Sequence, residues 1–421
     1  MSPVRRLVVV GQGYVGLPLA MQAVRAGHHV VGFDTDKARV DRLASGDSYV
    51  DDVTAADLVE ALDSGRYLPT TDAGDVAGFD VAVVSVPTPL ADGLPDLGAV
   101  EAAGRMLAGH LRPGATVILE STTYPGTTEE VLRPLLEAGS GLEAGAGFHL
   151  GYSPERIDPG NPTWTLANTP KVVSGVDEAS LAAVESFFGG LVHQTVPVAT
   201  TRAAELTKLL ENTFRHVNIA LVNELAMYAA EMGIDIWEVV DAAATKPFGF
   251  MPFRPGPGVG GHCLPVDPSY LSWRVERSIG RAFRFIELAN DINDHMPEYV
   301  VRRVADGLNR RRKPVNGSRI LVLGLAYKAN SGDARETPAA RVVDRLVSLG
   351  AEVAAADPHV PGHHFAGMAR RVDLDAAELA AADAVVVLAD HDAFDYDLVA
   401  AHASYVLDCR RRVHGPQVEY L

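Results

Sequence analysis

Short apolar runs alternate with helical segments over the first third of the chain, and this alternation constrains the fold more than any other feature. Strand-like runs are expected at 6–11, 28–34, 80–89 and 115–123, with helices at 18–27 and 97–111. Two parallel strands need a crossover connection, which is usually a helix. The alternation therefore predicts a doubly wound α/β domain built on a parallel sheet.

The same alternation returns near the end of the chain. A helix is expected at 337–350, with strands at 319–326, at 351–358, in the second half of 379–390 and at 404–411, the last strand. Between the two α/β parts, residues 201–232 form a helical pattern without Gly or Pro, and the basic segment 310–318 is typical of a linker. The two α/β parts look like one architecture used twice. The sequence predicts three domains, at 1–198, 199–312 and 313–421.

The segment "VVVGQGYVG" places Gly11, Gly13 and Gly16 in G-x-G-x-x-G spacing between a strand and a helix. The first glycine permits a tight turn, the second lets the backbone approach a pyrophosphate, and the third lets helix and strand pack closely. Asp34 ends the next strand, where its carboxylate can accept hydrogen bonds from ribose hydroxyls and repel a 2′-phosphate. The pattern predicts NAD rather than NADP. A tight strand–helix turn without a ligand is the alternative.

Length and charge bound the possible partners. The 421-residue chain is too long for a single core and carries a net charge of −17, which disfavours nucleic acid and anionic membrane surfaces as partners. No apolar run approaches the length of a membrane span. The two cysteines cannot form a disulfide framework, so a reducing cytoplasm is expected.

One of these cysteines, Cys263, lies in the loop "PGPGVGGHCLPVDP". An incidental small residue in a glycine-rich turn is one reading of it. The other is a nucleophile, because a thiolate adds to an aldehyde to give a thiohemiacetal, which can lose a hydride and become a thioester. Hydrolysis of the thioester then gives an acid. With NAD, such a cysteine predicts a four-electron oxidation of an alcohol that uses two NAD in turn.

This chemistry needs an oxyanion site and a base. Lys208 and Asn212 are four positions apart in the long helical pattern and share one face, which would suit an oxyanion. From the residues alone, two solvated helix residues explain this pair better. Asp267 and Glu155 are candidate bases, with a turn at "VDPSY" and a surface charge at "SPER" as the alternatives.

Longer motifs carry a resemblance that runs nearly end to end. They include "GQGYVGLP", "ESTTYPGTTEE", "YSPERIDPGN", "AELTKLLENTFRHVNIALVNE", "TKPFGFMPFRPGPGVGGHCLPVDPSYL", "FIELANDINDHMP", "VLGLAYKANSGDARETPA", "ADPHVP" and "LDCRR". Through them the chain resembles the nucleotide-sugar 6-dehydrogenase family, which includes UDP-glucose and UDP-N-acetylhexosamine dehydrogenases. The resemblance implies two Rossmann-like doubly wound domains, one for NAD and one for the nucleotide sugar. It also implies a helical middle domain whose long central helix forms much of a homodimer interface.

The resemblance also implies roles for single residues. Cys263 falls on the nucleophile, Lys208 and Asn212 on the pair that stabilises the oxyanion, Asp267 on a carboxylate that works with Lys208 through an ordered water, and Glu155 on the acid implicated in thioester hydrolysis. The remaining NAD-loop and nicotinamide-side positions are Tyr14, Val15, Pro87, Thr88 and Thr122. The expected nucleotide-sugar contacts are Arg156, Lys208, Asn212, Arg254, Gly260, Lys328, Arg335 and one of Arg410 and Arg411. No metal is expected.

The cysteine loop bears on the sugar. The UDP-glucose branch typically has serine before the cysteine and lysine three positions after it, whereas this chain has His262 and Val266. With "TKPFGF", these residues resemble the UDP-N-acetylglucosamine branch and imply a 2-acetamido sugar, oxidised to a uronic acid for polysaccharide or glycoside synthesis. Arg254 departs from the pattern, which has an aromatic there. It could touch sugar or phosphate, or be a solvated loop residue.

Three other interpretations of the sequence remain. A UDP- or dTDP-glucose 6-dehydrogenase would use the same chemistry on a different sugar. A non-catalytic NAD-binding scaffold would keep the fold without needing the cysteine and its helpers. A two-electron dehydrogenase would also have no use for Cys263.

Overall fold

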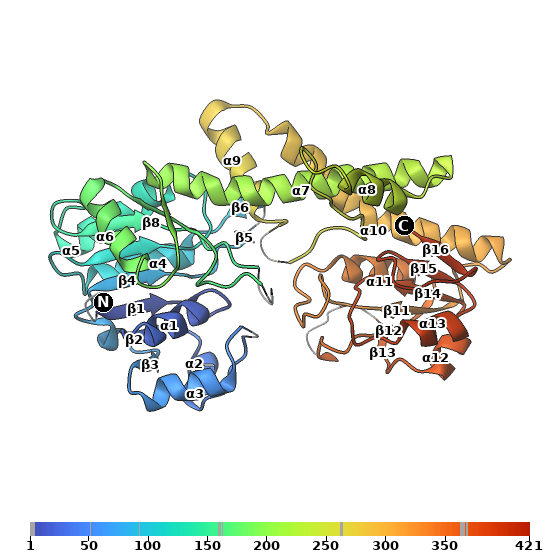
Figure 1. The fold of residues 1–421 in the computed structure, drawn as a ribbon, viewed down its shortest axis with the longest axis horizontal. Coiled ribbons are helices and arrows are strands. Elements are labelled where there is room, and N and C mark those ends of the chain that lie inside the picture. Colours follow the sequence, from blue (N-terminus) through green and yellow to red (C-terminus); the bar gives the residue numbers. More distant parts are fainter. Residues whose placement is uncertain are drawn as a thin grey trace. The chain divides into compact units, whose positions relative to one another are not determined.

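The computed structural model describes residues 5–50, 52–91, 93–158, 161, 163–261, 264–362, 367 and 369–421. The chain divides into two compact units (Figure 1). Unit 1 is Met1–Glu211 with Trp273–Ile279, and unit 2 is Asn212–Ser272 with Gly280–Leu421. Each unit has its own large sheet, so the two predicted α/β parts are confirmed.

The described strands of unit 1 form an eight-stranded sheet in the order β10-β9-β8-β7-β4-β1-β2-β3. Its neighbours pair in parallel except β8 with β9, which are antiparallel. Nearly continuous apolar runs such as "LVVV" form the central strands because both faces of a parallel sheet are covered. The strands are β1 (Arg6–Val10), β2 (His29–Phe33), β3 (Tyr67–Thr70), β4 (Val81–Val84), β7 (Thr116–Leu119), β8 (His149–Tyr152), β9 (Lys171–Gly175) and β10 (Thr195–Pro197).

Helices cover this sheet, and β5 (Leu90–Ala91) and β6 (Leu94–Pro95) form a separate antiparallel pair. The first helix packs Leu17 and Met21 into the core beside Val9 of β1, and it ends before Gly27, whose φ of +93° suits a residue without a Cβ. The helices and turns are α1 (Gly16–Arg25), α2 (Lys37–Ala44), α3 (Ala55–Asp63), η1 (Ala73–Val76), α4 (Gly98–Ala108), the π-helical η2 (Thr128–Leu132), α5 (Arg133–Ser140) and α6 (Glu178–Phe188).

The described strands of unit 2 form a six-stranded parallel sheet in the order β13-β12-β11-β14-β15-β16. Its strands are β11 (Arg319–Leu323), β12 (Glu352–Ala356), β13 (Arg370–Arg371), β14 (Ala384–Val387), β15 (Val406–Asp408) and β16 (Val418–Tyr420). The expectation that 404–411 holds the last strand is wrong, because β16 adds to the sheet beside β15. Around it lie α11 (Pro338–Ser348), α12 (Ala376–Ala381) and α13 (Tyr396–His402).

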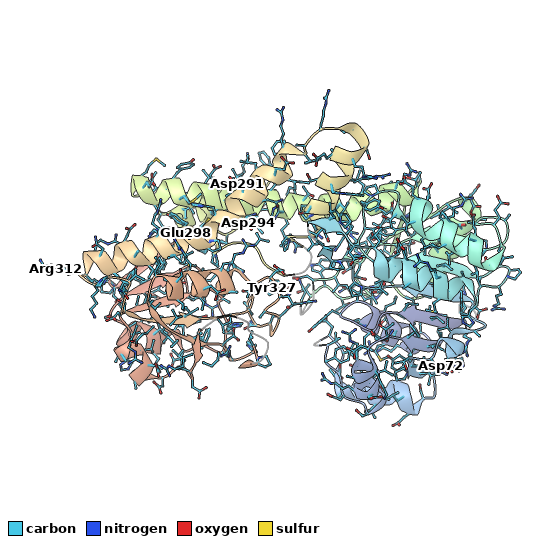
Figure 2. The ribbon with its side chains drawn as sticks, turned by 180° about the vertical axis from the view of Figure 1, so that it is seen from behind. Asp72, Asp291, Asp294, Glu298, Arg312 and Tyr327 are labelled. Carbon is cyan, nitrogen blue, oxygen red and sulfur yellow. The ribbon has the colours of Figure 1, made fainter. Side chains whose placement is uncertain are left out.

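Long helices connect the parts of the chain. The predicted helix at 201–232 is confirmed as α7 (Thr201–Met232), followed by α8 (Ile236–Ala244), α9 (Asp267–Ile279) and α10 (Arg284–Arg310). Within unit 2, α10 is tied to α11 by two ion pairs. Asp294 and Glu298, both labelled in Figure 2, pair with Arg341 at 2.6 Å and with Arg345 at 3.1 Å, respectively. No helix in the described ranges is long and apolar enough to cross a membrane.

Candidate active site

The glycine loop after β1 is shaped by contacts that leave no room for side chains at two of its three glycines. Gly11 has φ of +93°, and its N–H donates to the Phe33 carbonyl oxygen at 2.8 Å. A Cβ on Gly11 would lie 2.1 Å from the Ser85 carbonyl oxygen, and one on Gly16 would lie 1.9 Å from the Gly11 carbonyl oxygen. A Cβ on Gly13 would meet no atom within 4 Å. The open side of the loop is therefore at Gly13, where a pyrophosphate would approach.

Asp34 follows β2 and is buried against the same loop. Its Oδ2 accepts from the Gln12 N–H at 2.9 Å and from Arg39 Nη1 at 2.9 Å. The Arg39 guanidinium lies 5.6 Å from the centre of the Tyr49 ring. A carboxylate at the end of β2 is thus fixed in place next to the glycine loop.

The remaining cofactor positions fit a dinucleotide. Helix α1 begins at Gly16 with no side chain capping it. Its Leu17 N–H donates to the Gly13 carbonyl oxygen at 3.1 Å and Pro18 has no N–H, so the helix start offers an anion mainly its dipole. Tyr14 is exposed beside this helix end, and Val15 is its N-cap residue. On the neighbouring loops, Thr88 is buried and its hydroxyl donates to the Thr122 carbonyl oxygen at 2.8 Å, while Pro87 is exposed.

Glu155 belongs to a buried charge cluster in unit 1. Lys171 Nζ lies 3.0 Å from Glu155 Oε2 and 2.6 Å from Glu120 Oε1. Burial raises the pKa of Glu155, but the Lys171 ammonium outweighs it and holds this pKa below its usual value. Burial raises the pKa of Glu120 to about 7, with Lys171 opposing the rise and the Glu155 charge adding to it. The interpretation of Glu155 as a surface charge is therefore wrong.

Two backbone groups and one helix residue complete the surroundings of Glu155. The N–H groups of Arg156 and Ile157 donate to its Oε1 at 2.6 and 2.7 Å, and the charge of buried Lys208 further lowers its pKa. The Arg156 guanidinium is turned toward Glu211 at 2.6 Å. Glu155 is thus an ionised carboxylate held by donors on several sides.

Asn212 and Asp267 form a second buried pair, within unit 2. Asn212 Nδ2 donates to Asp267 Oδ2 at 2.5 Å. Asn212 is 4% exposed and Asp267, the first residue of α9, is 3% exposed, while Lys208 one turn earlier on α7 is 9% exposed. The interpretation of Lys208 and Asn212 as two solvated helix residues is therefore wrong.

Cys263 and His262 lie outside the described residues. The described part of their loop packs tightly on unit 2. A Cβ on Gly260 would lie 2.7 Å from the Glu336 carbonyl oxygen and 2.8 Å from Cβ of Tyr327 (labelled in Figure 2). The Gly261 N–H donates to the Arg335 carbonyl oxygen at 3.0 Å. The loop therefore lies against the segment that follows β11, where Lys328 is partly buried.

The arginines predicted to bind substrate differ in their surroundings. A Cβ on Gly256 would lie 2.8 Å from Arg410 Nη1, so Arg410 faces the cysteine loop. Arg411 instead pairs with Asp235 at 2.8 Å. Arg335 pairs with Asp333 at 2.6 Å and is half exposed. Arg254 pairs with Asp241 of α8 at 2.5 Å. Of the two alternatives in "CRR", Arg410 is the one next to the cysteine loop.

Sequence reasoning missed Glu120 and Lys171. Glu120 stands inside the quoted motif "ESTTYPGTTEE", and Lys171 precedes the apolar run "VVSG". A charged residue directly at the edge of a strand-like apolar run is the signal that could have drawn attention to both. Their pairing across 51 positions could not have been deduced from it.

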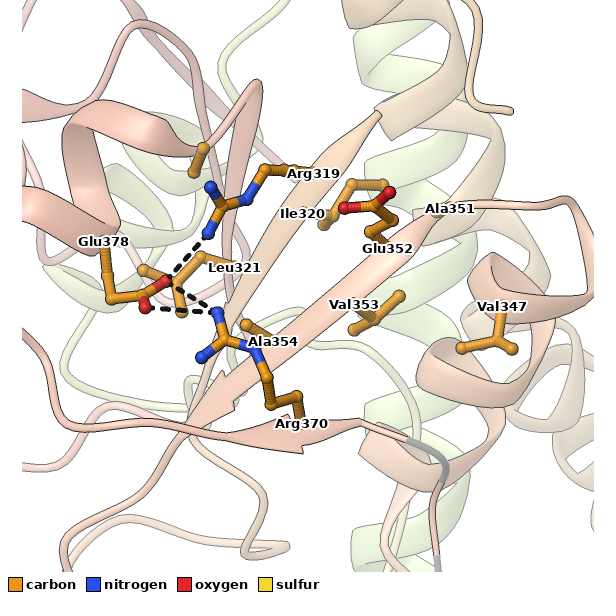
Figure 3. Close-up of a pocket in the computed structure, with 11 residues that line it drawn as sticks. Arg319, Ile320, Leu321, Val347, Ala351, Glu352, Val353, Ala354, Arg370 and Glu378 are labelled. Atoms are coloured by element: carbon orange, nitrogen blue, oxygen red, sulfur yellow. Dashed lines mark hydrogen bonds and ion pairs between the residues drawn. The ribbon is translucent and has the colours of Figure 1, made fainter. Parts of the chain in front are cut away.

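A hollow of about 390 Å³ in unit 2 lies away from these residues (Figure 3). It is at the edge of the sheet where β11 and β12 begin, and its arginines 319 and 370 are both bonded to Glu378. Ligands of open α/β sheets bind at the carboxyl ends of strands. The hollow is thus at the opposite edge from the predicted nucleotide site.

The two units and their glycine loops define a nicotinamide-dependent oxidoreductase with a second α/β nucleotide-binding domain. Models of the UDP-glucose/GDP-mannose dehydrogenase family match three consecutive parts of the chain: the NAD binding domain at 5–192, the central domain at 202–295 and the UDP binding domain at 321–415. The chain belongs to this family. It is an NAD-dependent nucleotide-sugar dehydrogenase, as predicted.

Known relatives support this assignment. UDP-N-acetyl-D-mannosamine dehydrogenase of Pyrococcus horikoshii is 36% identical over 99% of this chain and 98% of its own length. UDP-N-acetyl-D-glucosamine 6-dehydrogenase of Pseudomonas aeruginosa is 40% identical over 84% of this chain and 83% of its own length. The solved structure of the UDP-D-ManNAc dehydrogenase from Pyrococcus horikoshii matches with a TM-score of 0.89 at 33% identity, covering 99% of this chain and 98% of that one.

Proposed function

We propose that the protein oxidises C6 of UDP-N-acetylglucosamine, or of a close 2-acetamido epimer, to the uronic acid in a four-electron reaction at Cys263. The observation that supports this most is Glu155, a buried carboxylate whose pKa is held low in the NAD-binding unit. A two-electron alcohol dehydrogenase needs no hydrolytic base. A thioester-forming dehydrogenase does, because water must release the acid from the cysteine.

The proposed reaction starts at the C6 hydroxyl. The hydroxyl loses its proton to a base, C6 loses one of its two hydrogens as hydride, and the C6 aldehyde results. The Cys263 thiolate adds to this carbonyl carbon, and the oxygen takes a proton to complete the thiohemiacetal. NAD supplies the hydride acceptor, so two NAD per sugar carry away four electrons. Loss of the second hydride and of the hydroxyl proton leaves a thioester on Cys263.

Hydrolysis completes the reaction. Glu155 takes a proton from water as the water oxygen bonds to the thioester carbon, and the C–S bond then breaks to release the carboxylic acid and the Cys263 thiolate. Lys208 and Asn212 donate to the oxyanion that forms at this carbon, and their burial strengthens that interaction. Asp267 orients the Asn212 amide through their hydrogen bond. Thr122 is proposed to lie on the nicotinamide side.

The nucleotide sugar is proposed to bind through the residues gathered around the cysteine loop in unit 2. Gly260 allows the loop to lie close to the segment containing Lys328, and both can offer donors to phosphate or sugar oxygens. Arg410 is proposed for this role in preference to Arg411, because it faces Gly256 of the loop. Arg335 and Arg254 must exchange their carboxylate partners, Asp333 and Asp241, for substrate oxygens. Arg156 is proposed as a further contact of the sugar.

The acetamido sugar is supported by His262 and Val266 in the loop sequence and by the relatives. The Pyrococcus and Pseudomonas enzymes are named for UDP-N-acetyl-mannosamine and UDP-N-acetyl-glucosamine, both of which carry an acetamido group at C2. UDP-glucose or dTDP-glucose is the alternative substrate. The uronic acid product would serve polysaccharide or glycoside synthesis, and the presence of the buried free thiol Cys409 fits a cytoplasmic location.

A homodimer formed through α7 is part of the proposal, together with three domains at 1–198, 199–312 and 313–421. Large apolar side chains are exposed along α7 at spacings of three, four and seven residues, which places them on one stripe. They are Leu206, Leu210, Phe214, Leu221, Leu225, Tyr228 and Met232. Such a stripe is self-complementary, because a second copy can lay the same side chains against it.

Stoichiometry tests the reaction. With limiting UDP-N-acetylglucosamine and excess NAD, we expect two NADH per sugar by absorbance, and the uronic acid as product by mass spectrometry. One NADH per sugar with an aldehyde product would contradict the thioester route. If no nucleotide sugar gives NADH, the result would favour the alternative that the protein is a non-catalytic NAD-binding scaffold.

A further inference from the structure

We infer that Glu120 and Lys171 are positioning residues that act on Glu155, with Glu120 as an ionisable switch that changes the strength of Glu155 as the hydrolytic base. The inference rests on the proposed role of Glu155 in thioester hydrolysis. It assigns a function to two residues that lie outside the predicted site.

The cluster is built from the ends of three adjacent strands of unit 1. Glu120 directly follows β7, Glu155 lies three residues beyond β8, and Lys171 opens β9, in a sheet where β7, β8 and β9 are neighbours. The Lys171 ammonium is hydrogen-bonded to both carboxyl groups at 2.6 and 3.0 Å. Its position therefore fixes one oxygen of each carboxyl.

The other oxygen of Glu120 shows how the cluster holds a proton. Glu120 Oε2 is buried and has no hydrogen-bond partner among the described residues, whereas buried carboxylate oxygens are normally paired. Lys208 acts on Glu155, whereas Glu120 has only the Lys171 ammonium that it shares with Glu155, so an ionised Glu120 carries an incompletely compensated buried charge. A proton on Glu120 removes that charge. Since burial raises the pKa of Glu120 to about 7 and that of Glu155 is lowered, the proton resides on Glu120.

Among the described residues, the charged groups that act on Glu155 come from three elements. Lys171 comes from β9, Glu120 from the end of β7 and Lys208 from α7, while the Arg156 side chain turns away to Glu211. The Phe188 ring of α6 lies 5.1 Å from Lys171 Nζ and carries no charge. Glu120 is thus the group beside Glu155 whose own charge changes near neutral pH.

The sign of the effect follows from Coulomb interactions. Below about pH 7, Glu120 is neutral and Lys171 is left to Glu155, which makes Glu155 a weak base. Above about pH 7, the Glu120 carboxylate shares Lys171 and places a negative charge next to Glu155, which raises its affinity for the proton of water. Acid release should therefore accelerate as pH rises through the pKa of Glu120.

The test compares wild type with Glu120→Gln, which keeps the shape of the neutral form and cannot ionise. The rate of uronic acid release at saturating NAD and UDP-N-acetylglucosamine is measured between about pH 6 and about pH 9. We expect similar rates below about pH 7, and a deficit in the variant that grows to about tenfold at about pH 9, with KM values unchanged. Lys171→Arg, which keeps the cation, should retain the wild-type pH profile, and Lys171→Met should lose it.

Two further variants make the result decisive. Ser153→Ala removes a buried hydrogen bond of 2.6 Å to the Val172 carbonyl oxygen, next to the same strands but without charge, and should lower stability without changing the pH profile. A Glu120→Gln rate that equals wild type at every pH, or that falls equally at every pH, overturns the inference.

In parallel, Glu155→Gln should keep the initial NADH burst and lose acid release. If Glu155→Gln releases acid normally, the role of Glu155 fails and the inference fails with it. A defect in Glu155→Gln together with a wild-type Glu120→Gln profile rejects the inference alone.

Discussion

Asp34 and Asp357 occupy the same place in two different sheets. Asp34 follows β2 and accepts the Gln12 N–H at 2.9 Å, and Asp357 follows β12 and accepts the Leu325 N–H at 2.6 Å. In each unit, the residue just before the N–H donor is a glycine with positive φ. These glycines are Gly11, with φ of +93°, before Gln12 and Gly324, with φ of +87°, before Leu325. The two α/β parts thus share a local design in which an aspartate at the end of the second strand fixes the first loop.

The glycine loop allows binding to be separated from folding. Gly13→Ala adds a Cβ into open space, so we expect wild-type stability and an NAD Kd raised by about tenfold or more, because the methyl group holds the pyrophosphate off the backbone. Gly16→Ala places its Cβ 1.9 Å from a carbonyl oxygen and should lower the melting temperature strongly. Calorimetry and NAD titration measure both. Equal NAD affinity in Gly13→Ala and wild type would exclude this loop as the pyrophosphate site.

Cofactor preference is expected to depend on Asp34. Asp34→Ala removes a carboxylate that would repel a 2′-phosphate and frees Arg39, so the kcat/KM ratio of NAD to NADP should fall by about 10- to 100-fold. Asp36→Ser is the matched control, because Asp36 caps α2 through the N–H groups of Ala38 and Arg39, and serine can also cap. Equal use of NADP by the wild type would refute the prediction.

The two cysteines should differ in their effect on turnover. Cys263→Ser is expected to abolish steady-state turnover while nucleotide-sugar binding persists, because a hydroxyl lacks the acidity of a thiol. Cys409 is buried beside β15, and burial raises its pKa to about 12, so it is an inert thiol. Cys409→Ser should therefore keep turnover. The assays are NADH formation and calorimetric titration with substrate. Full activity in Cys263→Ser would remove the covalent mechanism.

Substrate preference is tested with a panel of nucleotide sugars. We expect kcat/KM to be highest for UDP-N-acetylglucosamine or UDP-N-acetylgalactosamine, since a pocket that hydrogen-bonds an acetamide leaves polar groups unpaired when a hydroxyl replaces it. UDP-glucose and dTDP-glucose should be at least about 100-fold poorer. A preference for either glucose nucleotide would assign the protein to the other branch without affecting the role of Cys263.

The apolar stripe on α7 gives a test of assembly. Leu210→Glu and Leu221→Glu each replace a side chain more than half exposed in the single chain, and each should raise the dimer Kd by about 100-fold if a second copy buries that side chain. Leu68→Glu on β3, also exposed, is the control and should leave the dimer intact. Analytical ultracentrifugation separates the outcomes. A monomeric wild-type protein would contradict the proposed homodimer formed through α7.

Much of the fold could be predicted because its longest helix and its central strands carry strong hydrophobic patterns. The bounds of α7 agree with the predicted 201–232, since 32 residues without Gly or Pro leave no internal stop signal. The strands β8, β9 and β10 were not anticipated, because their sequences HLGY, KVVSG and TVP lack the longer apolar runs of β1, β4 and β7. β16, with the sequence VEY after a turn at Gly415, lacks such a run as well.

The candidate site was predicted unevenly. Glycine spacing and the end of a strand point to Gly11, Gly13 and Asp34 because those roles are local in sequence. Glu120 and Lys171 could not be assigned, because their importance depends on a contact made only when β7 and β9 come together in the sheet. Residue type alone cannot tell a buried ion pair from two surface charges.

Glu120 and Glu155 share the ammonium of Lys171, and this sharing has a consequence for how such sequences can diverge. A lineage that first loses Glu120 keeps Lys171 paired with Glu155, one charge against the other. A lineage that first loses Lys171 passes through an ancestor with two buried acids and no cation between them, at a cost of about 3–5 kcal/mol. Evolution toward an uncharged pair at these positions therefore has a direction, with position 120 changing before position 171.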